Sequence, residues 1–167
     1  RERFYNARMF NQELNDWNVS SVTNMRAMFR FPSPFNQDIG AWDVSSVTIM
    51  SDMFNHSQVF NQDIGVWDVS SVTEMNSMFD GARVFDQDLS QWDVSSVTDM
   101  SKMFAFVRLS IANYDAILIN WSKLDLQMDV TFSGGHSRFS SAAIAARDTL
   151  TGSTFNWTIS DYGLQID

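Results

Sequence analysis

Carboxylate side chains recur along this chain at a constant interval of 25 residues, in two separate sets. The first set is Glu13, Asp38, Asp63 and Asp88, and the second, in which an asparagine comes first, is Asn18, Asp43, Asp68 and Asp93. Calcium prefers several oxygen ligands close together, so Asp43, Asp68 and Asp93 are weak candidates for a calcium site, and no other cofactor is expected. A Ser-Ser pair follows each of these aspartates, and its hydroxyl and N–H groups could bond the carboxylate instead. We favour hydrogen bonding, because the glycine-aspartate nonapeptide of calcium-binding β-rolls is absent.

Large side chains with binding chemistry of their own recur at the same interval. The tryptophans among them are Trp17, Trp42, Trp67 and Trp92. Aromatic faces can stack on sugar rings, but each tryptophan occupies the middle apolar position of its repeat, which favours a place in the core. Eight of the ten methionines fall at two positions of the repeat. We therefore expect them in the core rather than in a copper site.

The remaining composition excludes several classes of function. The net charge is −9, and an acidic surface repels the phosphates of nucleic acids and anionic membranes. No cysteine occurs, which excludes disulfides and thiolate metal sites. His56 and His136 stand in unlike contexts, and neither a nucleophile elbow nor a metal-binding histidine spacing occurs. The sequence also has no hydrophobic span. We therefore expect a protein that is not an enzyme, does not bind nucleic acid and does not insert into membranes.

Four consecutive repeats of 25 residues must position these side chains. They span 10–34, 35–59, 60–84 and 85–109, and a partial repeat spans 1–9. In the third repeat, Ile64, Trp67 and Val69 have the spacing of a leucine-rich-repeat strand, and a short helix capped by Thr73 is expected to follow. We therefore predict an α/β repeat solenoid: a right-handed leucine-rich-repeat-like coil with a parallel sheet on one face and short helices opposite.

The 25-residue pattern ends after Leu109, and residues 110–167 have the pattern of an α/β C-terminal cap that continues the solenoid. Apolar spacing predicts a helix from Ser110 to about Lys123 and another from Ser140 or Ser141 to near Leu150. Alternating apolar residues predict a strand at 128–132 and a last one at 157–159. The chain thus divides into a repeat solenoid at 1–109 and a cap at 110–167.

The repeats resemble those of the BspA-like leucine-rich-repeat surface proteins, especially the 25-residue form found in mycoplasma lipoproteins and marine bacterial surface proteins. The match is carried by the motifs FNQDI, WDVSSVT and MF of residues 60–79 and by their equivalents. It implies a surface-displayed or secreted solenoid, with adhesion linked to several members and no catalytic motif. The buried asparagine of ordinary leucine-rich repeats is replaced by Val22, Val47, Val72 and Val97. An asparagine ladder must therefore come from Asn11, Asn36 and Asn61, and Asp86 is expected to break it.

Stacked repeats would place equivalent residues about 4.8 Å apart on neighbouring strands, so outward strand positions form a candidate ligand-binding face. This face comprises Asp16, Asn18, Ser20, Ala41, Asp43, Ser45, Val66, Asp68, Ser70, Gln91, Asp93 and Ser95. We expect an extracellular or cell-surface module for binding and adhesion, which presents this acidic strand face to a protein or carbohydrate on another cell or matrix. The alternative is a structural spacer, a stalk, or a self-assembling subunit of a surface fibre or array. Further repeats of the same chain are expected at the N-terminus.

Overall fold

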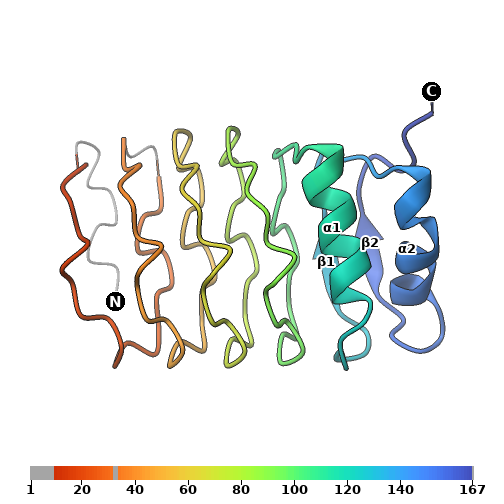
Figure 1. The fold of residues 1–167 in the computed structure, drawn as a ribbon, viewed down its shortest axis with the longest axis horizontal. Coiled ribbons are helices and arrows are strands. Elements are labelled where there is room, and N and C mark those ends of the chain that lie inside the picture. Colours follow the sequence, from red (N-terminus) through yellow and green to blue (C-terminus); the bar gives the residue numbers. More distant parts are fainter. Residues whose placement is uncertain (1–9, 32–33, 167) are drawn as a thin grey trace.

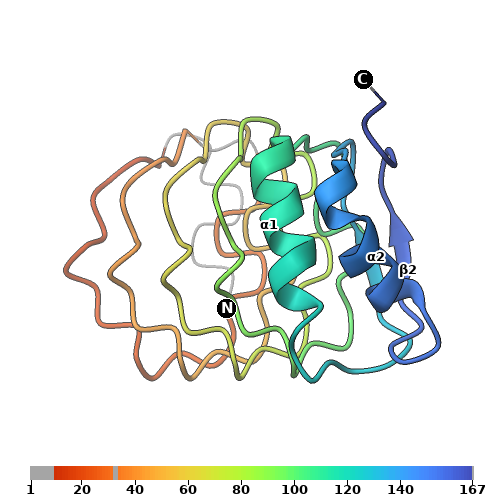
Figure 2. The ribbon, with the colours of Figure 1, turned by 45° about the vertical axis from the view of Figure 1, so that its right-hand side comes forward.

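Apolar residues at fixed places in each 25-residue repeat determine the arrangement of the chain, because no single repeat can bury them alone. The computed structural model describes residues 10–31 and 34–166. The repeats lie side by side along the long axis of an elongated body, and residues 110–166 follow them at one end (Figures 1 and 2). We call each repeat a layer. The partial repeat predicted at 1–9 lies outside the described residues.

Backbone hydrogen bonds join neighbouring layers at residues about one repeat apart. Met50 N–H donates to Glu74 O at 2.9 Å, and Thr73 N–H donates to Thr48 O at 2.8 Å. Isolated parallel bridges connect successive layers in the same region, and Ile49 with Glu74 is one of them. These contacts hold the described layers in register without a continuous strand.

The predicted α/β repeat solenoid is wrong. Both α-helices and the single two-stranded sheet of the described residues lie after Ser110, so the layers lack the parallel sheet and the opposing short helices of a leucine-rich-repeat coil. Turns replace the predicted strand of the third layer, because Trp67 N–H bonds to Ile64 O at 3.1 Å at its start. Another turn closes its end, where Val72 N–H bonds to Val69 O at 2.9 Å.

The helix predicted after Thr73 is absent for a different reason. Ser77 and Gly81 have φ values of 55° and 73°, and a right-handed helix cannot continue through left-handed residues. The other layers repeat both conformations, at Ala27, Asp52 and Lys102 and at Phe31, His56 and Phe106. Ser77 N–H donates to Ser101 O of the next layer at 2.9 Å, so backbone bonds run between layers rather than along a helix.

Stacked phenylalanine rings fill the core of the layers. Phe79 lies between Phe54, at 5.6 Å and an interplanar angle of 8°, and Phe104, at 5.4 Å and 4°. A second row runs beside the first, with Phe85 only 4.1 Å from Phe79. The eight methionines of the repeat are also buried, which confirms that they belong to the core.

Three of the four repeat tryptophans are buried as predicted. These residues, each at most 4% exposed, are Trp42, Trp67 and Trp92. Each donates its indole N–H to a carbonyl of the preceding layer, as Trp67 does to Ile39 O at 3.1 Å. Trp17, in the first described layer, is 38% exposed. The tryptophan row is therefore mainly a packing and hydrogen-bonding element.

Two helices cover part of the C-terminal segment (Figure 1). Helix α1, Ile111–Trp121, begins after Ser110, whose Oγ accepts a hydrogen bond from Asn113 N–H at 3.4 Å. The 3-10 helix η1, Ser141–Ala143, leads into helix α2, Ile144–Thr151. Both predicted helices are confirmed. None of the helices in the described residues has the length and apolar character needed to cross a bilayer.

Two short strands complete this segment. Strand β1, Thr131–Ser133, pairs in parallel with strand β2, Thr158–Ser160, and Phe132 lies opposite Ile159. Both strands lie close to their predicted places, although β1 begins later than expected. The division of the chain into residues 1–109 and 110–167 stays a prediction.

Candidate functional site

The second carboxylate set lies on turns rather than on a strand, so the predicted strand face is an edge made of loops. We call its members, Asn18, Asp43, Asp68 and Asp93, the acidic edge. In each layer the side-chain Oδ1 accepts the N–H of the serine two positions later. Ser70 shows the geometry, since its N–H and its hydroxyl donate to Asp68 Oδ1 at 3.1 and 2.6 Å. These bonds are those that the hydrogen-bonding interpretation of the sequence predicts.

The same bonds lower the pKa of two of these carboxylates. The Ser45 hydroxyl, and then its N–H, lower the pKa of Asp43, because both donors stabilise the charged form. Ser70 lowers the pKa of Asp68 in the same way, against weaker opposing effects of burial and of the charge on Asp43. The effect of Asp43 on Asp68 indicates that neighbouring layers bring the two carboxylates close together.

The other members of the candidate face follow the acidic edge from layer to layer. Eight of its residues are exposed, namely Asp16, Asn18, Ala41, Asp43, Val66, Asp68, Gln91 and Asp93. The four serines, Ser20, Ser45, Ser70 and Ser95, are half-buried, and each bonds the aspartate or asparagine two positions earlier. Val66 is 78% exposed and gives this polar surface an apolar spot.

The first carboxylate set makes a second row of turns. Asp63 Oδ1 accepts Gly65 N–H at 2.9 Å, and Asp38 and Asp88 accept the equivalent N–H groups at the same distance. Nowhere in 10–31 and 34–166 do three histidine or carboxylate side chains gather so that they could hold a metal ion. Calcium binding by Asp43, Asp68 and Asp93 stays a prediction.

A ladder of polar side chains links the layers to the C-terminal segment. Asn36 N–H donates to Asn11 Oδ1 at 3.2 Å, and Asn61 N–H donates to Asn36 Oδ1 at 2.9 Å, as predicted. Asp86 does not break the ladder. Its N–H donates to Asn61 Oδ1 at 2.9 Å, and its own Oδ1 accepts Ser110 N–H at 2.8 Å, because a carboxylate oxygen accepts as an amide oxygen does.

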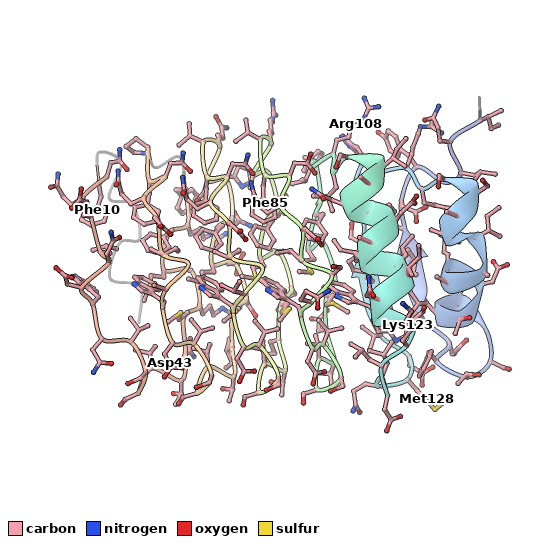
Figure 3. All side chains as sticks on the ribbon, viewed as in Figure 1. Phe10, Asp43, Phe85, Arg108, Lys123 and Met128 are labelled. Carbon is pink, nitrogen blue, oxygen red and sulfur yellow. The ribbon has the colours of Figure 1, made fainter. Side chains whose placement is uncertain are left out.

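Another edge carries basic and aromatic groups, of which the sequence analysis considered only His56 and His136. We call His56, Gln58, Arg83, Phe106, Arg108, His136 and Tyr162 the basic–aromatic edge. Figure 3 shows Arg108 at the upper side of the molecule and Asp43 at the lower side. Phe106 is 61% exposed and makes an edge-on contact with His136, whose ring stacks on Tyr162 at 4.7 Å. The residues at these positions differ from repeat to repeat, so the constant positions of the repeat do not reveal this edge.

Comparisons with known proteins give a match for most of the chain. The family model described as "Mycoplasma protein of unknown function, DUF285" matches residues 1–117, which include the four layers and the first part of α1. No curated protein and no solved structure matches the chain.

Proposed function

This chain belongs to the family described as "Mycoplasma protein of unknown function, DUF285", and from that premise we propose that it is a cell-surface module for binding and adhesion. Its acidic edge contacts a protein or a carbohydrate on another cell or matrix. The resemblance of its repeats to BspA-like surface proteins supports a place outside the cell. Its role is binding rather than catalysis, since the sequence carries no recognisable catalytic motif.

The observation that carries the proposal is a row of exposed carboxylates along one edge. Serine hydrogen bonds lower the pKa of both Asp43 and Asp68, which favours their charged form. Two like charges at the spacing of adjacent strands repel by about 0.9 kcal/mol even in water. A surface that keeps such charges side by side attracts cationic groups.

The chemistry of the edge therefore favours a partner that presents lysine, arginine or amino-sugar groups. Those cations would lie against the carboxylates, while Val66 and the serine hydroxyls offer apolar and hydrogen-bonding contacts beside them. Charge attraction between exposed groups weakens with added salt, because the Debye length falls to about 8 Å at physiological ionic strength. Binding at the acidic edge should show this salt dependence.

The test is the triple variant D43N/D68N/D93N, which removes charge without removing the turns. Asn18 shows that asparagine suits this position, since Ser20 N–H and hydroxyl bond its Oδ1 at 3.1 and 2.7 Å. Ligands are first identified on an array of matrix proteins and glycans, and affinities are then measured by biolayer interferometry. We expect the variant to lose about tenfold or more in affinity, equivalent to about 1.4 kcal/mol.

The matched control is D38N/D63N/D88N, which changes the net charge equally but in the neighbouring row. It should retain most of the affinity. Equal loss in both variants would show that only net charge matters, and unchanged binding by D43N/D68N/D93N would refute the acidic edge as the contact surface.

The alternative proposal is a structural spacer or a self-assembling subunit, and the way in which equivalent layers join through backbone bonds and stacked rings favours it. Phe54 and Phe79, for example, stack across neighbouring layers at 5.6 Å. A layer of another copy can be added through contacts of the same kind. Sedimentation analysis across concentration tests the idea, and a monomer at the highest concentration would exclude self-assembly while leaving the spacer role.

A further inference from the structure

The basic–aromatic edge contains a row of side chains, one from each layer, that is interrupted by a glycine. The residues that occupy one corner position in successive layers are Phe31, His56, Gly81 and Phe106, with φ values between 61° and 80°. Gly81 contributes no side chain, so a slot lies between His56 and Phe106, two layers apart. With layers spaced like neighbouring strands, the backbones that carry His56 and Phe106 are about 10 Å apart.

The slot is a pocket of about 220 Å³, lined by His56, Gln58, Gly81, Arg83 and Phe106. Pockets for drug-sized ligands are larger, at roughly 300–1,000 Å³, so this one suits a single ring rather than an extended molecule. Van der Waals contact needs about 3.5–4 Å on each side of a bound ring. The His56 ring reaches into the interval of about 10 Å between the two backbones, so the slot has room for one ring and no more.

The walls of the slot are fixed by the surrounding structure. Gly81 N–H donates to Ala105 O at 2.8 Å, and His56 N–H donates to Asp80 O at 2.6 Å, so the corner backbone is bonded on both sides. His56 Nδ1 also lies 2.8 Å from Asn55 Oδ1. A binding site whose backbone is already held loses little entropy when its ligand arrives.

The charge of the slot contrasts with that of the molecule. None of its five lining residues is acidic, and Arg83 supplies a guanidinium in a chain whose net charge is −9. Arg108 occupies the equivalent position one layer further on. Guanidinium groups bind carboxylates through two parallel hydrogen bonds, which gives direction as well as charge attraction.

We propose that this slot binds a sugar ring that carries a carboxylate, such as a hexuronic acid residue of a glycan. The ring lies between His56 and Phe106, Arg83 binds the carboxylate, and Gln58 bonds ring hydroxyls. Gly81 is required because any side chain there would occupy the space of the sugar. A Cβ at this position would lie only 3.2–3.3 Å from atoms of the His56 ring. This site is separate from the acidic edge and does not depend on it.

The neighbouring layers supply the variants that test the slot. Gly81→Phe places in the gap the residue found at Phe31 and Phe106, which adopt the same left-handed conformation. Arg83→Gln introduces the residue that Gln58 provides one layer earlier and removes only the cation. Because Arg83 is exposed, the second variant keeps the test valid if the first does not fold.

The probes are a hexuronic-acid disaccharide and its neutral hexose counterpart, titrated at millimolar concentration while backbone amides are followed by NMR. We expect the acidic disaccharide to shift amides around 56–58, 81–83 and 106, and the neutral one to bind at least tenfold more weakly. Arg83→Gln should reduce the affinity for the acidic disaccharide tenfold or more, and Gly81→Phe should abolish the shifts. D43N/D68N/D93N should leave them unchanged.

Three results would overturn the proposal. The absence of shifts at these amides would exclude the slot as a sugar site. Equal affinity for the acidic and neutral disaccharides would refute the role of Arg83, as would unchanged binding by Arg83→Gln. Full binding by a folded Gly81→Phe variant would place the sugar elsewhere.

Discussion

The layers and the C-terminal segment differ in how their aromatic rings pack and in how their backbone groups are hydrogen-bonded. In the layers, equivalent phenylalanines stack nearly parallel, with Phe79 and Phe104 inclined by 4°. At the boundary Phe132 meets Phe104 at 84°, and the stacked row ends there. Beyond it, α1 and α2 satisfy their backbone groups internally, whereas the layers bond theirs to the next layer.

This difference shows that an exact repeat can take over the role of regular secondary structure. When the same backbone conformation recurs one layer away, a turn can be completed by the equivalent turn in the next repeat. Asn36 and Asn61 do this through their side chains, and Thr48 and Thr73 through their backbones. Where the repeat ends, helix caps such as Ser110 are required instead.

The largest expected effect comes from breaking the stacked row. Phe79→Ala should lower the free energy of unfolding by about 3–5 kcal/mol, because a fully buried ring is lost between two others in a core that cannot collapse freely. Urea unfolding followed by tryptophan fluorescence measures the change. Phe106→Ala, at an exposed position, is the control and should change stability by less than about 0.5 kcal/mol. Equal effects of the two substitutions would contradict the dominance of the stacked row.

A smaller effect, which appears at alkaline pH, should arise in the C-terminal segment. The hydroxyl of Tyr114 donates to Asp161 Oδ2 at 2.8 Å, and Arg147 Nε lies 2.9 Å from the same oxygen. Burial, followed by the negative charge of Asp161, raises the pKa of Tyr114 well above 10.0. Below pH 10 this tyrosine is protonated in both states and its contribution to stability is complete. Above pH 10 only the unfolded chain loses the proton, so stability falls by about 1.4 kcal/mol per pH unit until the folded pKa is reached.

Comparison with Tyr114→Phe isolates this effect from other groups that titrate at high pH. Urea unfolding at several values between about pH 9 and 11.5 should show a steeper decline for the unsubstituted protein than for the variant. Parallel declines would show that Tyr114 ionises equally in the folded and unfolded chains.

The periodic sequence predicted most of the buried residues, with Trp17 as an exception, but not the backbone that buries them. Spacing alone placed Trp67 and Met75 in the core, and helical periodicity located α1 and α2. It failed at Ser77 and its equivalents, whose left-handed φ values end any helix. Alanine, aspartate, serine and lysine occupy that position in the four layers, so no shared side-chain property reveals it. Bonds between layers determine the conformation, and a reading of one repeat cannot include them.

The bonds of the acidic edge could be predicted from the sequence, whereas the slot of the basic–aromatic edge could not. The Asx turns of the acidic edge are local, so the sequence Asp-Val-Ser-Ser was enough to predict the bonds from Ser70 to Asp68. The slot at Gly81 is created by residues from three layers. Only the structure shows that His56 and Phe106 flank a missing side chain.

The smallest effect should test whether charge on the acidic edge is set within each turn. In Ser70→Ala the hydroxyl bond to Asp68 is lost while the backbone bond can remain, so the pKa of Asp68 should rise toward its ordinary value. Carbonyl NMR titration of the side chains measures this shift, with Asp43 in the same protein as an internal control that should keep its lowered pKa. The free energy of unfolding should change little, because the Asp68 carboxylate is exposed. If the pKa of Asp68 did not move, its ionisation would depend on neighbouring layers instead, and the charge of the acidic edge would have the same non-local origin as the Gly81 slot.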